Sequence, residues 1–458
     1  MEKRKILIIG AGRSASSLIH YLSEKAGEEH LEVTVGDISL ENALKKTENR
    51  PHTKGMRLDI FEAEARRKAV REHDLIISML PARFHLEVAK DALEEGKHMV
   101  TASYVSKEMK ELDGEVRSKG LVFMNEIGLD PGIDHMSAMK LLDEIRDKGG
   151  RIISFQSYTG GLVAPGSDDN LWHYKFTWNP RNVVLAGQGG AAQFLKEGKL
   201  KYIPYHKLFR RTEIIEIDGY GKFEAYANRD SLKYQDAYGL SGVDTLFRGT
   251  VRRLGFSKAW NVFVQLGMTD DSYVMEDSGT MSYRDFVNAF LPYHPYDPVE
   301  AKLRSYLRID PDDELWQKLE ELDIFSREKF FEMPGATPAQ LLQKILMDKW
   351  TLNPEDKDMI VMLHRIGYEY GGKKRQIESS MVVIGDDPVC TAMSKTVGLP
   401  VGIAALKILN GEIDTPGVQI PTEKDIYLPV LKELREYGME FDEKEVPYTG
   451  YNPEQIIG

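Results

Sequence analysis

The features that most constrain the fold of this chain lie within its first 37 residues. Residues 5–10 (KILIIG) form a short apolar run that ends on a glycine, which is typical of a buried strand in a parallel sheet. A glycine-containing turn follows at residues 10–17 (GAGRSASS), and apolar residues then recur at helical spacing. A second strand is expected over residues 31–36, with Asp37 at its end. This succession predicts a doubly wound α/β sheet.

The turn has the pattern Gly10-x-Gly12-x-x-Ala15, a variant of the dinucleotide-binding fingerprint. Gly10 permits the tight turn, Gly12 lets the main chain approach a pyrophosphate, and a small Ala15 allows the helix and the strand to pack closely. The N-terminus of the helix then faces the phosphate charge. A Rossmann-type nucleotide domain is therefore predicted, and the alternative is a structural glycine turn in an α/β protein.

Asp37 bears on the choice of nucleotide. A carboxylate at this position accepts hydrogen bonds from both ribose hydroxyls and repels a 2′-phosphate, which favours NAD over NADP. Arg13, inside the turn, points the other way because a guanidinium attracts a 2′-phosphate. The alternative role of Asp37 is a strand-end acid that caps the next turn.

Composition excludes several classes of protein. A chain of 458 residues is expected to form two or three domains, and a net charge of −12 argues against a nucleic-acid interface. Cys390 is the single cysteine, so we expect no intramolecular disulfide, no cysteine-rich zinc site and a reducing cytoplasm. Scattered histidines support no metal site. The apolar runs are shorter than the roughly 20 residues of a membrane helix, and we expect no signal peptide before the first strand.

The pattern of the chain changes along its length. Strands and helices alternate up to about residue 130, so residues 1–130 are predicted to form the Rossmann-type domain, completed by about 390–458. Residues 131–281 and 371–389 are predicted to form an α+β substrate domain with a mixed sheet, and residues 282–370 a helical insert. Within the returning segment, a helix of small residues is expected to break around Pro400.

Several blocks of sequence carry a family resemblance. They are residues 74–81 (DLIISMLP), 100–106 (VTASYVS), 124–135 (MNEIGLDPGIDH), 157–162 (SYTGGL), 174–178 (YKFTW), 228–231 (NRDS), 395–400 (KTVGLP) and 417–421 (GVQIP). Together they resemble saccharopine dehydrogenase of the glutamate-forming type, also called saccharopine reductase. The motifs extend over nearly the whole chain.

The resemblance implies a reversible oxidation of saccharopine to L-glutamate and 2-aminoadipate 6-semialdehyde in lysine metabolism. The enzyme would act on a CH–NH bond with NAD as acceptor, NADP remaining open. Its partner would be this small-molecule substrate, and no nucleic-acid or membrane partner is expected. The oligomeric state to test is a homodimer. The expected location is the cytoplasm.

The resemblance also implies a set of site residues. The cofactor residues are Gly10, Gly12, Arg13, Ser14, Asp37, Leu80, Ala102, Ser103, Gly128, Leu129, Asp130 and Trp178. The substrate residues are Ser103, Tyr104, Asp130, Arg229, Thr250, Val251 and Arg252, and the candidate catalytic residues are Asp130, Tyr104 and Thr159.

Physical arguments support some of these assignments and leave alternatives. Saccharopine carries three carboxylates, so an acidic protein must gather cations locally, and Arg229 and Arg252 supply them. The alternative is a basic surface stripe that balances neighbouring acids. Ser103 and Tyr104 follow a strand, at the sheet edge where open α/β sheets bind ligands, although Tyr104 also suits the rim of a domain interface.

Other positions have structural alternatives as well. Asp130 is placed to cap a helix whose first residue is Pro131, and Asp134 with His135 suits the start of that helix. Relatives have cysteine where this chain has Thr159, which can still donate a hydrogen bond but cannot act as a thiol. Trp178 is either a lid over the nicotinamide or a buried core residue.

Two rival functions remain open at this stage. One is a related secondary-amine dehydrogenase such as carboxynorspermidine dehydrogenase, whose substrate has fewer carboxylates. The other is a non-catalytic NAD-binding regulator, which would have no need of a pocket for several carboxylates.

Overall fold

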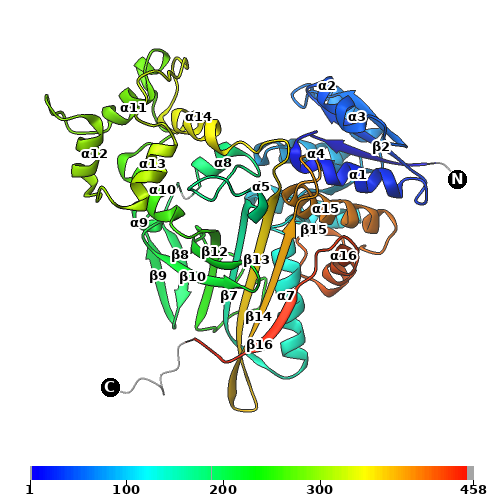
Figure 1. Ribbon diagram of the computed structural model, residues 1–458. Coiled ribbons are helices and arrows are strands. Elements are labelled where there is room, and N and C mark those ends of the chain that lie inside the picture. The colour runs from blue at the N-terminus through cyan, green and yellow to red at the C-terminus, as the bar shows by residue number, and fades with distance from the viewer. Residues whose placement is uncertain (1–2, 187, 451–458) are drawn as a thin grey trace. The chain divides into compact units, whose positions relative to one another are not determined.

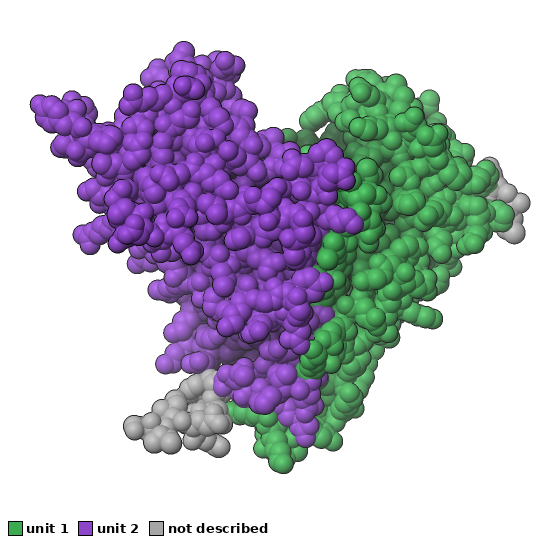
Figure 2. All heavy atoms as spheres, viewed as in Figure 1, with its two compact units in different colours: residues 1–152, 368–374, 381–444 green, residues 153–367, 375–380, 445–458 purple. Residues whose placement is uncertain are grey.

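The structure is a computed structural model that describes residues 3–186 and 188–450 (Figure 1). The chain divides into two compact units, coloured green and purple in Figure 2. Unit 1 comprises residues 1–152, 368–374 and 381–444, and unit 2 comprises residues 153–367, 375–380 and 445–458.

Unit 1 contains a seven-stranded sheet in which every pair of neighbours is parallel. Its strands are β1 (Arg4–Ile9), β2 (Leu31–Asp37), β3 (Thr53–Arg57), β4 (Leu75–Ser78), β5 (His98–Val100), β6 (Val122–Met124) and β15 (Gly417–Gln419). The strand order β15-β6-β5-β4-β1-β2-β3 contains the Rossmann order 3-2-1-4-5-6. The predicted fold class is confirmed for this part of the chain.

Helices connect and cover the strands of unit 1. They are α1 (Ser16–Lys25), α2 (Leu40–Thr47), α3 (Ala63–Arg71), α4 (His85–Glu94), α5 (Lys107–Glu111), α6 (Asp113–Ser118), α7 (Ile133–Asp147), α15 (Ala392–Leu409) and α16 (Lys424–Glu436). Helix α7 belongs to unit 1, beyond the boundary expected at residue 130. The C-terminal helices return to this unit, where α15 packs on α1 and α16 packs on α7 (Figure 1).

The expected break at Pro400 is wrong, because α15 is one continuous helix with Pro400 inside it. Close packing compensates for the hydrogen bond that proline removes. An added Cβ at Gly398 would lie 2.8 Å from the main-chain nitrogen of Leu18, so the two helices approach at backbone distance. Helix α15 is long and apolar enough to cross a membrane by composition, yet 72% of it is buried inside the fold, which is typical of a core helix.

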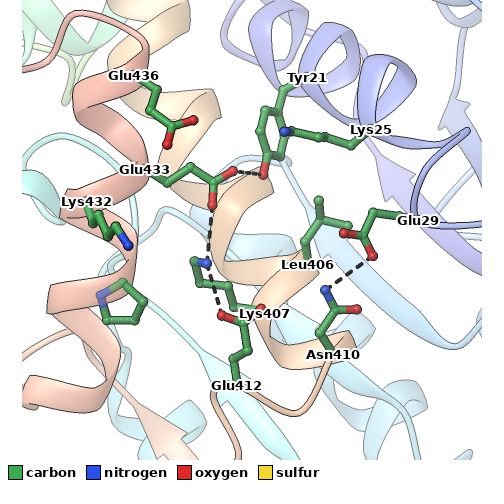
Figure 3. Close-up of a pocket in the computed structure, with 11 residues that line it drawn as sticks. Tyr21, Lys25, Glu29, Leu406, Lys407, Asn410, Glu412, Lys432, Glu433 and Glu436 are labelled. Atoms are coloured by element: carbon green, nitrogen blue, oxygen red, sulfur yellow. Dashed lines mark hydrogen bonds and ion pairs between the residues drawn. The ribbon is translucent and has the colours of Figure 1, made fainter.

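A polar network also fastens the C-terminal helices to α1. A cavity of about 370 Å³ lies among α1, α15 and α16, and Figure 3 shows Glu433 between Tyr21 and Lys407 in its wall. The Tyr21 hydroxyl donates to Glu433 Oε1 at 2.6 Å, and Lys407 Nζ lies 3.3 Å from Glu433 Oε2. Lys407 also donates to Glu412 Oε2 at 3.2 Å. The three helices are therefore joined by charge-assisted bonds as well as by apolar contact.

Most of the second sheet belongs to unit 2. Its strands are β7 (Arg151–Val163), β8 (Ala192–Lys196), β9 (Lys199–Ile203), β10 (Thr212–Ile217), β11 (Gly221–Ala227), β12 (Thr245–Arg253), β13 (Asp358–Tyr370), β14 (Lys373–Ile384) and β16 (Asp442–Val446). The main path runs β10-β11-β12-β7-β13-β14-β16, and beside it β8 pairs with β12 and β9 pairs with β8. Strands β12 and β7 are parallel and β10, β11 and β12 are antiparallel, so the sheet is mixed, as predicted.

Helices complete unit 2. They are α8 (Pro180–Val184), α9 (Tyr205–Leu208), α10 (Phe256–Leu266), α11 (Tyr283–Ala289), α12 (Val299–Leu307), α13 (Glu314–Glu321) and α14 (Pro338–Trp350). The helical region thus ends at Trp350, and β13 occupies residues that the sequence analysis assigned to the insert. Three buried tryptophans, Trp172, Trp260 and Trp350, pack against Phe256 in the core of this unit.

Candidate active site

The glycine turn of unit 1 follows β1 as the sequence predicts. Gly10 has φ +107°, and an added Cβ would lie 2.9 Å from the carbonyl oxygen of Met79, so only glycine fits. An added Cβ at Gly12 would meet nothing within 4 Å, so a ligand can approach the main chain there. Ala15 is buried under the first turn, and Ser14 beside it is half-buried.

A cavity of about 310 Å³ opens beside this turn. Its lining consists of Ile9, Gly10, Gly12, Gly36, Asp37, Ile38, Leu58, Asp59, Ile60, Phe61, Met79, Leu80, Pro81 and Phe84. Three of the predicted cofactor positions besides Gly10, namely Gly12, Asp37 and Leu80, therefore surround one space. The lining combines a glycine-containing turn, apolar walls and carboxylates. These features suit the pyrophosphate, the base and the ribose of a dinucleotide, respectively.

The charged residues in this lining are both acidic, although the Arg83 guanidinium lies 4.6 Å from the ring centre of Phe84 in the wall. Asp37 and Asp59 contribute carboxylates, and no lysine, arginine or histidine belongs to the lining. Arg13 is exposed to solvent and is not part of the lining. The Phe61 and Phe84 rings meet edge to face at 5.4 Å and form one apolar wall.

Main-chain donors hold the Asp37 carboxylate in place. Ala11 N donates to Asp37 Oδ2 at 2.8 Å, and Ser39 N donates to Asp37 Oδ1 at 2.9 Å. The side chain therefore caps the next turn, as the structural alternative expected, and at the same time faces the nucleotide cavity. Two main-chain donors hold the carboxylate in one orientation beside the cavity, where an acid can accept from ribose hydroxyls.

The predicted residues after β5 and β6 lie together in unit 1. The Tyr104 hydroxyl donates to Asp130 Oδ1 at 3.4 Å, which brings two of the three candidate catalytic residues into contact. Tyr104 is 48% exposed, and Asp130 is half-buried. An added Cβ at Gly128 would lie 2.9 Å from Ala102 Cβ, so these two loops pack at close distance, with Leu129 buried beside them.

Asp130 does not cap the following helix. Helix α7 begins at Ile133, later than the sequence analysis placed it, and its N-cap residue is Gly132. Among the described residues no side chain caps this helix, and Asp134 Oδ1 instead accepts from the main-chain N–H of the N-cap residue Gly132 at 2.7 Å. The Asp130 carboxylate is consequently not committed to a helix cap.

Two buried side chains, His135 and Glu126, hold these loops in place. His135 Nε2 lies 2.9 Å from Glu126 Oε2, and Glu126 Oε1 accepts from Val105 N at 2.9 Å. Both side chains are buried. They join the start of α7 to the segment that carries Ser103 and Tyr104, in line with the structural role expected of His135.

Sequence reasoning missed His85, the first residue of α4. Its Nδ1 lies 2.8 Å from Ser78 Oγ, and its Nε2 lies 2.7 Å from Ser103 Oγ. Burial lowers the pKa of His85 to about 4, so the ring is neutral at ordinary pH. No sequence motif could have revealed it, since its partners come from two other segments.

Unit 2 brings together the other predicted residues on β7 and β12. Thr159 pairs with Thr250 in the parallel register of these strands. Thr159 Oγ1 is buried without a hydrogen-bond partner among the described residues, whereas Thr250 Oγ1 donates to Asn228 Oδ1 at 2.7 Å. Thr159 therefore offers a hydroxyl that the fold itself does not use.

Arg252 is buried rather than part of a surface stripe. Its side chain is 5% exposed, and Nη1 donates to the carbonyl of Val251 at 2.8 Å. The guanidinium lies over the rings of Tyr174, at 5.0 Å, and Phe256, at 5.4 Å. Within residues 3–186 and 188–450 it has no carboxylate partner, and its Nε has no hydrogen-bond partner.

Arg229 and Trp178 are both exposed. Arg229 follows β11, and its guanidinium has no ion pair in the described part of the chain. Trp178 is 37% exposed, which rules out the buried-core alternative. Lys175, three positions before it, is buried between Asp169 at 2.8 Å and Asp356 at 2.7 Å, and these ion pairs fix the segment that ends in Trp178.

Comparisons with known proteins agree with this arrangement. The family model described as "Saccharopine dehydrogenase NADP binding domain" matches residues 6–124, and "Saccharopine dehydrogenase C-terminal domain" matches residues 128–439. The two models together match most of the chain.

Curated relatives cover the chain almost completely. The NADP(+), L-glutamate-forming saccharopine dehydrogenase of Schizosaccharomyces pombe is 33% identical over 449 residues, covering 96% of this chain and 98% of its own length. The enzyme of that description from Saccharomyces cerevisiae is 33% identical over 453 residues, covering 97% and 99%. The mitochondrial alpha-aminoadipic semialdehyde synthase of Mus musculus is also 33% identical, but the chain spans only 48% of that protein's length.

Solved structures give a consistent result. The apo saccharopine dehydrogenase (L-Glu forming) of Saccharomyces cerevisiae matches with a TM-score of 0.87 at 31% identity, covering 97% of this chain and 100% of that one. A homospermidine synthase from Legionella pneumophila, at 12% identity and a TM-score of 0.51, is similar in fold alone. On the family models, the near-complete relatives and this structural match, the chain belongs to the saccharopine dehydrogenase family.

Proposed function

We propose that this chain is a glutamate-forming saccharopine dehydrogenase of lysine metabolism. In the proposed reaction, saccharopine, the oxidised nicotinamide dinucleotide and water give L-glutamate, 2-aminoadipate 6-semialdehyde, the reduced dinucleotide and a proton. The reverse reaction condenses the two products and reduces the imine that they form.

The observation that carries the proposal is the buried Arg252 guanidinium. A buried cation without a carboxylate partner is costly unless a ligand supplies the anion. Saccharopine brings three carboxylates, and a guanidinium binds a carboxylate through two parallel hydrogen bonds. Arg229, exposed and without an ion pair among the described residues, is proposed to hold a second carboxylate, with Thr250 and Val251 beside Arg252 on β12.

The proposed chemistry assigns separate roles to the side chains. When bound, the nicotinamide ring accepts a hydride from the substrate carbon on the lysine side of the secondary amine. Asp130 holds the substrate's amino group, and Tyr104 donates to Asp130 Oδ1 and orients it. The Thr159 hydroxyl donates to the oxygen of the carbinolamine that forms when water adds to the substrate imine. Solvent and the substrate's own groups carry the protons.

The proposed cofactor is NAD rather than NADP. Asp37 is fixed by two main-chain donors, Asp59 adds a second carboxylate, and among the described residues no cationic side chain lines the cavity. A 2′-phosphate placed there would be repelled by both acids and attracted by none of the lining residues. The fungal relatives carry NADP(+) in their descriptions, so this chain is proposed to differ from them in nucleotide preference.

The direct test is the absorbance of the reduced nicotinamide when the purified chain meets saccharopine with NAD and then with NADP. The proposal expects a rise with both, and a larger kcat/KM with NAD. Turnover of carboxynorspermidine but not saccharopine would favour the related secondary-amine dehydrogenase. Nucleotide binding without turnover of either substrate would favour a regulator. A homodimer and a cytoplasmic location stay predictions from the sequence.

A further inference from the structure

Three side chains of unit 1 form a chain of hydrogen bonds beneath the predicted ligand site. Ser78 ends β4, His85 begins α4, and Ser103 follows β5. The imidazole bridges the two hydroxyls, at 2.8 Å from Ser78 Oγ and 2.7 Å from Ser103 Oγ, and Thr101 Oγ1 lies 3.4 Å from the same Nε2. Strands β4 and β5 are parallel neighbours, and β4 also pairs with β1, so both serines lie at the carboxyl edge where this fold binds ligands.

The imidazole of His85 is a neutral ring with one donor and one acceptor. It is 5% exposed, and burial lowers its pKa to about 4. In a neutral imidazole one nitrogen carries hydrogen and the other accepts. The two serines therefore receive opposite roles, and the tautomer decides which serine is the donor.

Ser78 selects the tautomer. Its side chain is fully buried, and within the described part of the chain Ser78 Oγ has His85 Nδ1 as its only hydrogen-bond partner. If Nδ1 carried the hydrogen, the Ser78 hydroxyl would be left as a buried donor without an acceptor, which costs more than an unused acceptor lone pair. The buried Thr101 hydroxyl, with Oγ1 3.4 Å from Nε2, would favour the opposite tautomer as a donor, but its contact is longer than the 2.8 Å contact of Ser78. The favoured arrangement therefore has Ser78 donating to Nδ1 and Nε2–H donating to Ser103 Oγ.

We infer that His85 is a positioning residue that commits the Ser103 hydroxyl to donate outward, to an acceptor oxygen of the bound ligand. The ring donates to Ser103 Oγ, so the hydrogen of that hydroxyl remains for another acceptor. Thr101 Oγ1 accepts from Ser103 N at 3.3 Å and helps to fix the main chain of this residue. No acceptor for the Ser103 hydroxyl other than the ring lies among the described residues.

The acceptor class follows from where Ser103 lies. An amide or ribose oxygen of the dinucleotide and a carboxylate oxygen of saccharopine share the required chemistry. The inference rests on the proposed function only for the second source. Affinity for NADH alone and the KM for saccharopine distinguish the two.

The first test observes the ring itself and needs no turnover. Long-range ¹H–¹⁵N spectra of histidine-labelled protein distinguish Nε2–H from Nδ1–H, and loss of a signal in His85→Gln assigns it. We expect the Nε2–H tautomer at pH 7. A ring with hydrogen on Nδ1 would overturn the inference whatever the enzyme activity.

The second test asks whether His85 acts through Ser103. Ser103→Ala and His85→Gln should each weaken NADH affinity or kcat/KM by about three- to tenfold, the range of one neutral hydrogen bond. The double variant should be no weaker than Ser103→Ala, because His85 has nothing left to position. Ser78→Ala should likewise be silent in the Ser103→Ala background.

His73 provides a matched control. It is also buried, and its Nε2 lies 2.8 Å from Thr34 Oγ1. His73 precedes β4, whereas the site residues lie at the carboxyl end of that strand. His73→Gln should lower the free energy of unfolding about as much as His85→Gln does. It should leave NADH affinity and kcat/KM unchanged. Independent, multiplying effects of His85→Gln and Ser103→Ala, or equal losses in the His73 variant, would make His85 merely structural. If the wild type does not turn over saccharopine, the proposed function is contradicted. The NADH affinities and the NMR spectra still test the role of His85, because neither needs turnover.

Discussion

At the scale of single residues, Asp37 is the position that we propose governs nucleotide choice. Its carboxylate is held by Ala11 N and Ser39 N and lines the nucleotide cavity. Replacing Asp37 by Ser removes the charge that opposes a 2′-phosphate. We expect the NADP-to-NAD ratio of kcat/KM to rise by about fivefold to tenfold, the scale of about 1 kcal/mol for one hydrogen bond.

Asp59→Asn tests the same argument at the second acid of the cavity and should shift the ratio in the same direction. Stopped assays with both nucleotides at saturating saccharopine give the ratio. A wild type that strongly selects NADP contradicts the argument and turns attention to Arg13, the cation of the turn.

A substitution of Arg252 is expected to affect substrate binding and fold stability differently. The guanidinium is buried over aromatic rings without a carboxylate partner among the described residues. Arg252→Met should raise the KM for saccharopine by about thirtyfold or more, since truncating one side of a desolvated charge pair costs about 2–5 kcal/mol. The free energy of unfolding without ligand should be unchanged or higher, because a buried charge without its counter-ion is removed.

Arg253→Met is the matched control. This neighbour donates from Nη1 to the carbonyl of Tyr220 at 3.0 Å and is not a predicted site residue. It should keep the KM of the wild type and lose some stability in urea unfolding. Loss of stability in Arg252→Met with an unchanged KM would show that Arg252 is part of the fold and not of the substrate site.

At the scale of elements, the contact between α1 and α15 depends on glycine. An added Cβ at Gly398 would lie 2.8 Å from Leu18 N and 3.0 Å from the carbonyl oxygen of Ser14, both main-chain atoms that cannot move aside. Gly398→Ala should therefore lower the free energy of unfolding by about 1–3 kcal/mol, although alanine is the better helix former.

Gly114, in α6, is the control for this substitution. An added Cβ there meets nothing within 4 Å, so Gly114→Ala should stabilise by about 0.5–1 kcal/mol through helix propensity alone. Urea unfolding of both variants checks the pair. Equal effects of the two substitutions would mean that α15 does not approach α1 at backbone distance.

At the element scale, local sequence patterns explain which elements are predictable, and non-local packing explains which are not. The strands β1 and β2, the glycine turn and Asp37 are predictable because apolar runs and glycine spacing are local signals. Pro400 was misjudged because the packing of α15, a non-local effect, outweighs the local cost of proline. The start of α7 was misplaced because its N-cap is Gly132, whose main-chain N–H donates to Asp134, and Asp130 lies before the helix.

Partners from distant segments explain the rest of the candidate site. His85 joins Ser78 to Ser103, and Glu126 joins His135 to Val105, and neither set follows a spacing that a motif would reveal. The burial of Arg252 is likewise a property of the mixed sheet and its aromatic neighbours. The residue types were predictable from the family resemblance, but their environments were not.

At the scale of the whole molecule, buried histidines set an acid limit to stability. The pKa of His85 falls from 6.5 to about 4 on burial, so below pH 6.5 the unfolded chain binds a proton that the folded chain does not. Stability from this group is complete above pH 6.5 and falls by up to about 3 kcal/mol as the pH approaches 4. Burial lowers the pKa of His73 and His98 in the same direction.

Urea unfolding between pH 7 and pH 4.5 measures this limit. We expect the free energy of unfolding to decline over that range and the decline to be shallower in His85→Gln, which cannot titrate. An equal decline in both proteins would mean that His85 is protonated within the folded chain.

The proposed activity of the whole molecule is tested most directly by its products. Purified chain, saccharopine and NAD are incubated, and glutamate, lysine, 2-oxoglutarate and NADH are quantified together. The account predicts equal amounts of glutamate and NADH, with no lysine and no 2-oxoglutarate. Lysine and 2-oxoglutarate in place of glutamate, or no NADH with either nucleotide, would contradict it.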